Sequence, residues 1–321
     1  MRILELELQH FRNYSGQRVS FDPDCNVIFG ENAQGKTNLL EAIRSLINDK
    51  RDWADSRLLR ALCDGEAYAV PRLGDEETVD KLQALKVYTQ YRDLISTAPL
   101  EIIYSGSADL ERVKQALAAA FATLPREEVR VISTAAPHVC RESVQYVEDV
   151  LDVTQGKLGM GFSCGSDDMP ALLMGNTLFG GSSNSKLFLN VREKLSLCYY
   201  ASSLYHRQKG LITVSSGIEF QNYQRAYDEI MAQLEAVQKG ELEDWELEGA
   251  RSTLLNSYAT VGDSQGKLEN FYLGQAATGQ HETPADLARA IQDMTAERIC
   301  RAMSTVKLDT VYFLKGKEAE A

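Results

Sequence analysis

The sequence predicts an α+β fold in which an antiparallel or mixed sheet carries helices on one face. Short apolar stretches with the alternation of strands recur at 144–163, 199–216 and 310–314. Longer stretches with the spacing of amphipathic helices stand between them, at 223–239, 242–258 and 267–303. No internal repeat or low-complexity segment interrupts this order, so a layer of helices on a sheet accounts for the whole pattern.

Residues 1–45 form the first of three predicted parts. Leu4, Leu6 and Leu8 alternate with polar residues, as in a half-buried strand. A second strand is expected at 19–21 and a third at 26–29, and a helix follows from residue 38. The third strand leads directly into a glycine-rich loop, so this part has a strand, a loop and a helix in succession.

Residues 46–97 form the second predicted part, a helical segment. Trp53, Leu58 and Leu62 recur at helix spacing, and a glycine- and proline-marked loop follows at 65–74. A further helix is expected at 79–95, with an apolar stripe that includes Tyr88 and Tyr91. Thr97-Ala98-Pro99 is the candidate linker to the third part.

Residues 98–318 form the third part, a complete α+β domain. We expect its strands at 100–104, 129–132, 144–147, 156–163, 199–205, 211–216 and 310–314. We expect its helices at 109–121, 170–179, 185–195, 223–239, 242–258, 267–276, 284–293 and 296–303. Gly180-Gly181 ends one helix, and the polar residues 182–184 cap the next.

Composition excludes several classes of protein. The 321 residues carry a net charge of −12, which disfavours nucleic-acid binding unless basic residues gather locally. The six cysteines show no C-x-x-C spacing, as expected for reduced thiols in a cytoplasmic protein. No apolar run is long enough for a membrane span, and the first residues do not resemble a secretory signal. The four histidines are scattered, so no metal site is predicted.

The loop at 30–37 matches the full phosphate-loop pattern. Its glycines let backbone N–H groups turn toward phosphate oxygens, the lysine reaches the β- and γ-phosphates, and the threonine ligates Mg²⁺. The candidate nucleotide-binding residues are Gly30, Asn32, Gly35, Lys36 and Thr37. ATP with Mg²⁺ is the ligand that such a loop would hold.

Residues 8–14 (LQHFRNY) and 26–42 (NVIFGENAQGKTNLLEA) resemble the opening of the RecF family of recombination-repair ATPases. The resemblance covers residues 1–45. The rest of the chain shows neither the signature loop nor the acid-terminated apolar strand that hydrolysis in that family needs. We therefore expect no complete ATPase and no nucleic-acid partner.

Residues 46–318 resemble the pitrilysin/insulinase-type zinc peptidases, and they are most similar to the non-catalytic bacterial partner subgroup. The most specific stretch runs from Leu178-Phe179-Gly180-Gly181 to Tyr199, and it contains an arginine and a tyrosine seven residues apart. The resemblance implies that residues 46–97 are the helical tail of an incomplete first peptidase-like domain and that residues 98–318 are a complete second one. It also implies that Arg192 and Tyr199 contact a peptide substrate. The family's zinc motif, His-x-x-Glu-His, is missing, which implies no catalytic residue and no zinc.

Three functions remain as alternatives. The first is a non-catalytic peptidase-like half that binds a peptide and pairs with a zinc-bearing partner or with itself. The second is an ATP-binding replication and repair protein of the RecF type. The third is a fused or truncated gene product without independent activity, which the abrupt change of character near residues 43–46 favours.

Overall fold

The computed structural model describes residues 5–11, 14–22, 36–71, 74, 78, 81–130 and 137–317. The chain divides into two compact units, residues 1–55 and 56–321. None of the helices described is both long and apolar enough to cross a membrane.

The first unit contains a β-hairpin and most of a long helix. Strands β1 (Glu5–Phe11) and β2 (Tyr14–Ser20) pair antiparallel, and helix α1 (Lys36–Leu62) follows. Leu6 and Leu8 point to one side of the hairpin and are buried with Leu39 of α1. The alternation is therefore confirmed as a strand pattern at residues 5–8, whereas Leu4 and the strand expected at 26–29 lie outside the described residues.

The second unit contains the larger core. Its strands are β3 (Gln145–Leu151), β4 (Gly156–Cys164), β5 (Cys198–His206), β6 (Leu211–Ile218) and β7 (Val306–Gly316). Its α-helices are α3 (Ala84–Thr97), α4 (Leu110–Phe121), α5 (Met169–Asn176), α6 (Tyr223–Lys239), α7 (Asp244–Ala259), α8 (Gln265–Thr278), α9 (Pro284–Gln292) and α10 (Ala296–Met303). Short 3₁₀ turns are η1 (Ala67–Ala69), η4 (Phe220–Asn222) and η5 (Val261–Asp263), and two π-helical segments are η2 (Thr177–Gly181) and η3 (Leu187–Lys194).

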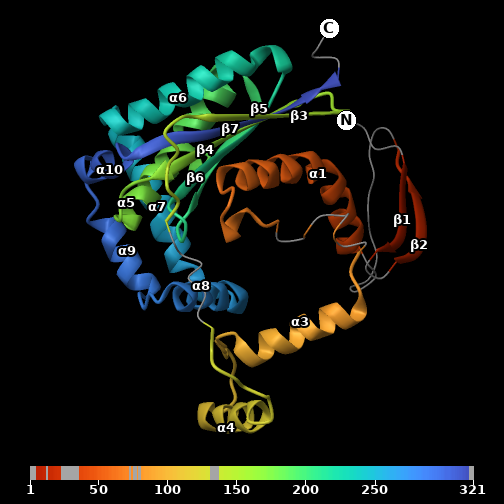
Figure 1. The fold of residues 1–321 in the computed structure, drawn as a ribbon. Coiled ribbons are helices and arrows are strands. Elements are labelled where there is room, and N and C mark those ends of the chain that lie inside the picture. Colours follow the sequence, from red (N-terminus) through yellow and green to blue (C-terminus); the bar gives the residue numbers. More distant parts are fainter. Residues whose placement is uncertain are drawn as a thin grey trace. The chain divides into compact units, whose positions relative to one another are not determined.

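The five strands form one mixed sheet in the order β3-β7-β4-β6-β5. Strand β3 runs parallel to β7, and the other three pairings are antiparallel. Helices α5, α6, α7, α9 and α10 lie together on one face of this sheet (Figure 1). The predicted α+β class, with a mixed sheet and a helical layer on one face, is confirmed.

Strand β4 shows how the two faces of the sheet differ. Leu158, Met160 and Phe162 are almost fully buried in the core shared with the helical layer. The alternate residues include Gly159 and Gly161, which face the last turns of α1. A Cβ atom at Gly161 would lie 2.7 Å from the Leu62 side chain, so only glycine allows α1 to approach the strand this closely. The end of α1 thus covers part of the second face.

The helix ends carry caps that the sequence supplies. Asp168 accepts the Ala171 N–H at the start of α5, and Thr283 forms a capping box with Asp286 at the start of α9. Gly240, with φ 78°, ends α6 in the left-handed conformation that glycine adopts without strain. These caps fix the residues at which α5 and α9 begin and α6 ends.

The strand predicted at 100–104 is wrong. These residues are irregular, and Leu100 and Ile102 are exposed. A strand needs a neighbour to bond its N–H and C=O groups, and none of the described strands pairs with these residues. The strand predicted at 129–132 is irregular at 129–130, and its remaining two residues lie outside the described residues.

Candidate functional site

The candidate substrate-binding residues lie at the two ends of one sharp turn between η3 and β5. The Ser185 hydroxyl accepts the Phe188 N–H at 3.4 Å, at the start of this segment, and Leu187 and Val191 anchor it in the core. After η3, the Leu197 N–H donates to the Val191 carbonyl at 3.0 Å. This bond joins residues six apart, one more than the closing bond of a Schellman motif, and it ends η3 sharply.

Ser196 gives this turn its shape. Its φ of 51° is the only positive φ of a non-glycine residue in the described part of the chain. Serine pays a steric cost in this left-handed region, and residues held there cluster at functional sites. The π-helical form of η3 also indicates a functional site, because π-helical turns are frequent at such sites.

Tyr199 is turned outward by an irregularity in the sheet. Cys198 pairs with Ile218 and Tyr200 pairs with Gly217, so Tyr199 is the extra residue of a bulge. Its side chain is 59% exposed, and its hydroxyl donates to the Glu219 carboxylate. This hydrogen bond, together with the negative charge of Glu219, raises the pKa of Tyr199. The tyrosine therefore stays protonated, with its hydrogen directed to Glu219 and its oxygen able to accept a further hydrogen bond.

Arg192 stands on the last turn of η3. Its guanidinium lies 4.7 Å from the centre of the Phe188 ring and 3.5 Å from the Glu193 carboxylate. The aromatic contact orients the guanidinium without satisfying its five N–H donors. The structure thus holds Arg192 and Tyr199 in one segment, each with a local partner that fixes its direction.

Strand β5 is an edge of the sheet. It pairs with β6 on one side, and the sheet order places no other described strand on its outer side. Leu204, in the middle of β5, is 60% exposed. An open strand edge can add an extended peptide through main-chain hydrogen bonds.

The nucleotide-binding candidates are placed only in part. Gly30, Asn32 and Gly35 lie outside the described residues. The backbone of Lys36 and Thr37 opens helix α1, as a phosphate loop requires.

A second polar site, which sequence reasoning missed, joins the loop after α1 to strand β7. We call it the buried ionic cluster; it consists of Cys63, Glu66, His138, Arg141, Lys209 and Asp309. The His138 ring lies 2.6 Å from a Glu66 oxygen through Nδ1 and 3.2 Å from an Asp309 oxygen through Nε2. The His138 side chain is only 4% exposed, so it acts as an internal bridge.

The charges of the buried ionic cluster compensate one another. Arg141 donates to Asp309 through its backbone N–H and its guanidinium, at 2.8 and 2.6 Å, and Lys209 pairs with Glu66. Burial raises the pKa of the Asp309 carboxyl, but these hydrogen bonds outweigh it and bring the pKa below its ordinary value. The pKa of Glu66 is lowered in the same way, by Lys209 and His138 against burial.

The buried ionic cluster fits a metal ion poorly. Cys63, Glu66 and His138 bring three ligand atoms within 4.8 Å of one another. Burial, however, raises the pKa of the Cys63 thiol to about 11, and the Lys209 ammonium already neutralises Glu66. A thiol that stays protonated and a carboxylate paired with an ammonium do not make a divalent-cation site. The cluster is instead a structural link between distant segments.

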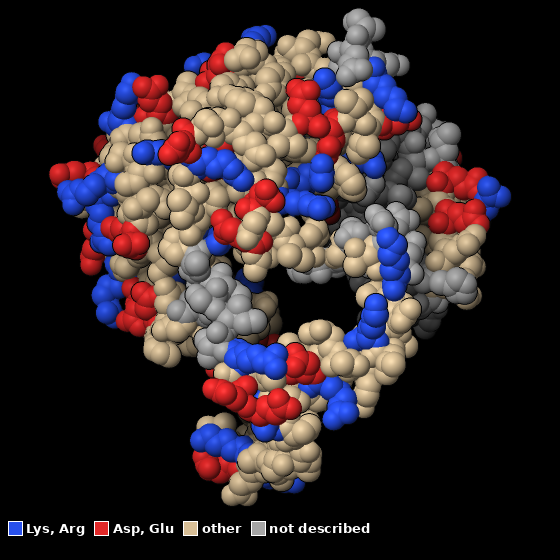
Figure 2. Space-filling model, in the orientation of Figure 1, with Lys and Arg blue, Asp and Glu red and all other residues tan. Residues whose placement is uncertain are grey.

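Surface charge adds one further observation. On the face drawn in Figure 2, basic and acidic side chains are interspersed over the described residues. A protein that follows a nucleic-acid backbone gathers its basic residues into a patch or stripe. The face shown has no such patch among the described residues.

Two family models match separate parts of the chain. Residues 81–254 match the family model of the peptidase M16 inactive domain, and residues 5–58 match a model of an AAA domain. The chain is 36% identical over 293 residues to the probable inactive metalloprotease YmfF of Bacillus subtilis, covering 89% of the chain and 68% of that protein.

A solved structure and a second relative complete the comparisons. A conserved protein of Enterococcus faecalis superimposes with a TM-score of 0.76 at 26% identity, over 88% of the chain and 67% of that protein. The replication and repair protein RecF of Latilactobacillus sakei is 65% identical over 62 residues, which are 19% of the chain and only 16% of RecF. The RecF-like part is therefore a short fragment of its relatives.

Proposed function

The chain belongs to the M16 peptidase family, in the group with the inactive domain, and from this premise we propose that it is a non-catalytic half that binds a peptide and pairs with a zinc-bearing peptidase. The single observation that carries the proposal is the arrangement of Arg192 and Tyr199 around the strained turn at Ser196, beside the open edge of β5. This arrangement offers the guanidinium donors of Arg192 and the hydroxyl oxygen of Tyr199 next to a strand edge.

The peptide would lie along β5 as an added strand. Main-chain groups of β5 would hold its backbone, and exposed side chains such as Leu204 would contact its side chains. Arg192 would donate to a peptide carbonyl, and the protonated Tyr199 hydroxyl would bond the same region. Both residues then fix the register of the peptide without chemistry of their own.

The absence of catalysis follows from the residue types. The four histidines of the chain are His10, His138, His206 and His281, and they form no His-x-x-Glu-His motif. His138 is committed to the buried ionic cluster, and His206 bonds Tyr68 and Thr213 at 2.9 and 3.0 Å. We propose that zinc is supplied by the partner, so metal analysis of the purified chain should find zinc well below one ion per chain.

A peptide-binding measurement tests the proposal. A fluorescein-labelled, unstructured peptide of about twelve residues should bind the full chain saturably in an anisotropy titration. Arg192→Gln and Tyr199→Phe should each weaken binding about tenfold, because each removes a charge-assisted or directed hydrogen bond. Arg225→Gln, which removes an exposed arginine of α6, is the matched control and should bind as the unchanged chain does. Equal binding by all three variants would contradict the role of the turn.

Nucleotide binding is a second candidate function, favoured by the 65% identity to RecF. We propose that residues 30–37 bind Mg-ATP without hydrolysing it. The chain spans only 16% of that relative, so the rest of an ATPase is not matched. Equilibrium dialysis with labelled ATP, with Lys36→Ala as control, tests this. Binding that survives Lys36→Ala would exclude the phosphate loop as its site.

A further inference from the structure

A cavity of about 470 Å³ lies at the far end of β5 from Tyr199. It is enclosed by the end of β4, the β5–β6 turn, helix α8 and the loop that follows α8. We call it the β4–α8 pocket. Its volume falls in the range of small-molecule sites. Tyr199 and Tyr205 stand six residues apart on the same strand, roughly 20 Å, so this pocket is separate from the proposed peptide site.

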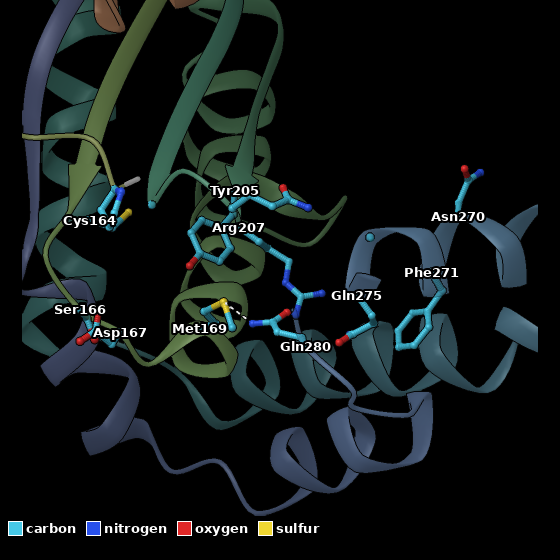
Figure 3. A pocket seen from close by; sticks show the side chains of 14 residues that line it. Cys164, Ser166, Asp167, Met169, Tyr205, Arg207, Asn270, Phe271, Gln275 and Gln280 are labelled. Atoms are coloured by element: carbon cyan, nitrogen blue, oxygen red, sulfur yellow. Dashed lines mark hydrogen bonds between the residues drawn. The ribbon is translucent and has the colours of Figure 1, made fainter. Parts of the chain in front are cut away.

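Arg207 is the central charged residue of the β4–α8 pocket. It follows β5 directly, is half-buried, and runs toward Gln275 and Gln280 (Figure 3). In the part of the chain that the structure describes, no carboxylate pairs with this guanidinium. A half-buried cation that lacks a counter-ion favours an anionic ligand.

Asp168 and Asp167 do not fill this role. Asp168 is held by Arg298 in a two-point ion pair, at 2.6 and 2.9 Å, and it also caps α5. Asp167 lines the pocket but is exposed. The exposed Asp167 adds a negative charge to the lining, so a ligand with one negative charge fits beside Arg207 better than a phosphate ester with two or more.

Neutral donors and apolar side chains complete the lining. Burial raises the pKa of Tyr205, so its hydroxyl remains a donor at neutral pH. The Gln280 amide N–H₂ donates to the Met169 sulfur at 3.5 Å. Sulfur is a weak acceptor, so a carboxylate oxygen would accept a stronger hydrogen bond from this amide. Met169 and Phe271 give the pocket an apolar side. The lining therefore matches a ligand with one anionic group and one apolar group.

We propose that the β4–α8 pocket binds a small monocarboxylate with an apolar substituent. Its carboxylate pairs with Arg207, and its substituent lies against Met169 and Phe271. A free organic acid and the carboxyl end of a peptide share this chemistry. The proposal holds independently of the peptide site at the turn before β5, since it uses none of the same residues.

Isothermal titration calorimetry with N-acetyl-L-phenylalanine tests the proposal on the full chain. We expect saturable binding with a Kd of about 1 mM, as for a fragment-sized ligand. N-acetyl-L-phenylalaninamide, which lacks the charge, should bind at least about tenfold more weakly. An acetylated tripeptide ending in phenylalanine distinguishes the two sources, because tighter binding of the tripeptide identifies a peptide end as the ligand.

Two pairs of variants test the location. Arg207→Gln should weaken binding about tenfold, whereas Arg225→Gln on α6 should not. Gly274→Met should block the pocket, because a Cβ there meets no atom within 4 Å and the longer side chain extends into open space. Its control, Gly266→Met, changes the same helix outside the pocket and should bind normally.

The folded state of each variant is checked by thermal unfolding. Both methionine variants are expected to fold, because methionine has a higher helix propensity than glycine.

Three results would overturn the proposal. They are no saturable binding by the unchanged chain, equal binding of the amide, and undiminished binding by both Arg207→Gln and Gly274→Met.

Discussion

Lys186 and Glu246 form an ion pair that is almost completely buried, with both side chains no more than a tenth exposed. The Lys186 ammonium lies 3.0 Å from each Glu246 oxygen. Lys186 precedes η3, and Glu246 stands in the first turn of α7, where it also accepts the Glu243 N–H at 2.9 Å. One carboxylate therefore ties the segment before Arg192 to the helical layer.

Removing one partner of this pair is expected to cost more than removing both. Lys186→Met leaves an uncompensated buried carboxylate and should lower the free energy of unfolding by about 3–5 kcal/mol. The double variant Lys186→Met, Glu246→Leu should recover most of this loss, because no buried charge remains. Urea denaturation measures both. A double variant as unstable as the single one would show that the capping role of Glu246, not the ion pair, supports the fold.

The residues of the candidate sites differ in how well the sequence reveals them. Arg192 and Tyr199 stand close together in one quoted stretch, so a resemblance can point to them. The buried ionic cluster joins His138 to Asp309 across 171 positions, and it joins Arg141 to a carbonyl 80 positions away. No local pattern links such residues, because tertiary folding alone brings them together. The positive φ of Ser196 could not be predicted from the sequence either, because no local pattern indicates that a serine adopts this conformation.

Elements with strong caps and one buried face are predicted best. Helix α6 begins and ends where the sequence predicts, since its apolar stripe is buried and Gly240 stops it. The strand expected at 100–104 fails, because an apolar stretch indicates a strand only where another strand can pair with it. The stripe of α3 is also helical as expected, yet Leu85 is 75% exposed, and Tyr88 and Tyr91 are exposed too.

The exposed stripe of α3 leads to a prediction at the scale of one helix. A large apolar surface of this kind marks an interaction site. Leu85→Glu with Tyr88→Glu should leave the unfolding temperature nearly unchanged, because neither side chain is buried. The same variant should abolish self-association or pairing with a zinc-bearing partner, measured by light scattering on a sizing column. Leu110→Glu on α4, another exposed leucine, is the control for added charge. Unchanged assembly would exclude the α3 stripe as the interface.

The η1 segment is tied to the sheet by groups that titrate, so its attachment should depend on pH. Burial lowers the pKa of His206, which bonds Tyr68 of η1. The unfolded chain then takes up the proton first, and stability falls as the pH drops through the ordinary histidine value of 6.5. Glu66 and Asp309 have lowered pKa values, so their contribution is present at neutral pH and is lost only at lower pH, as each carboxylate protonates.

Urea denaturation at a series of pH values separates these two effects. Between about pH 7.5 and 5.5 the unchanged chain should lose stability, and His206→Gln should remove most of that slope. Below about pH 4.5 both proteins should lose stability together, since the carboxylates remain in each. A slope in the upper range that persists in His206→Gln would assign it to another group.

At the scale of the whole molecule, two different similarities divide the chain near helix α1. The AAA match runs from residue 5 to 58, the boundary between the compact units falls at residues 55 and 56, and the M16 match begins at residue 81. Helix α1 is continuous through this boundary. In the second unit, the end of α1 is fixed by its buried residues Leu58 and Leu62 and by Arg57, which pairs with Asp149 of β3 at 2.8 Å. The segment before residue 56 has only the small cluster around Leu6, Leu8 and Leu39 among its described residues.

Limited proteolysis with and without Mg-ATP shows which unit determines the function. Trypsin should remove the residues before the boundary and leave a stable core that begins near Arg51 or Arg57, because the second unit contains the large shared core. The rate of this cleavage should not change with Mg-ATP if the phosphate loop has lost its role. Protection by Mg-ATP, absent in Lys36→Ala, would mean that nucleotide binding stabilises the first unit. The peptidase-like unit would then carry a nucleotide-dependent extension, and peptide binding at the turn before β5 would have to be measured again with nucleotide present.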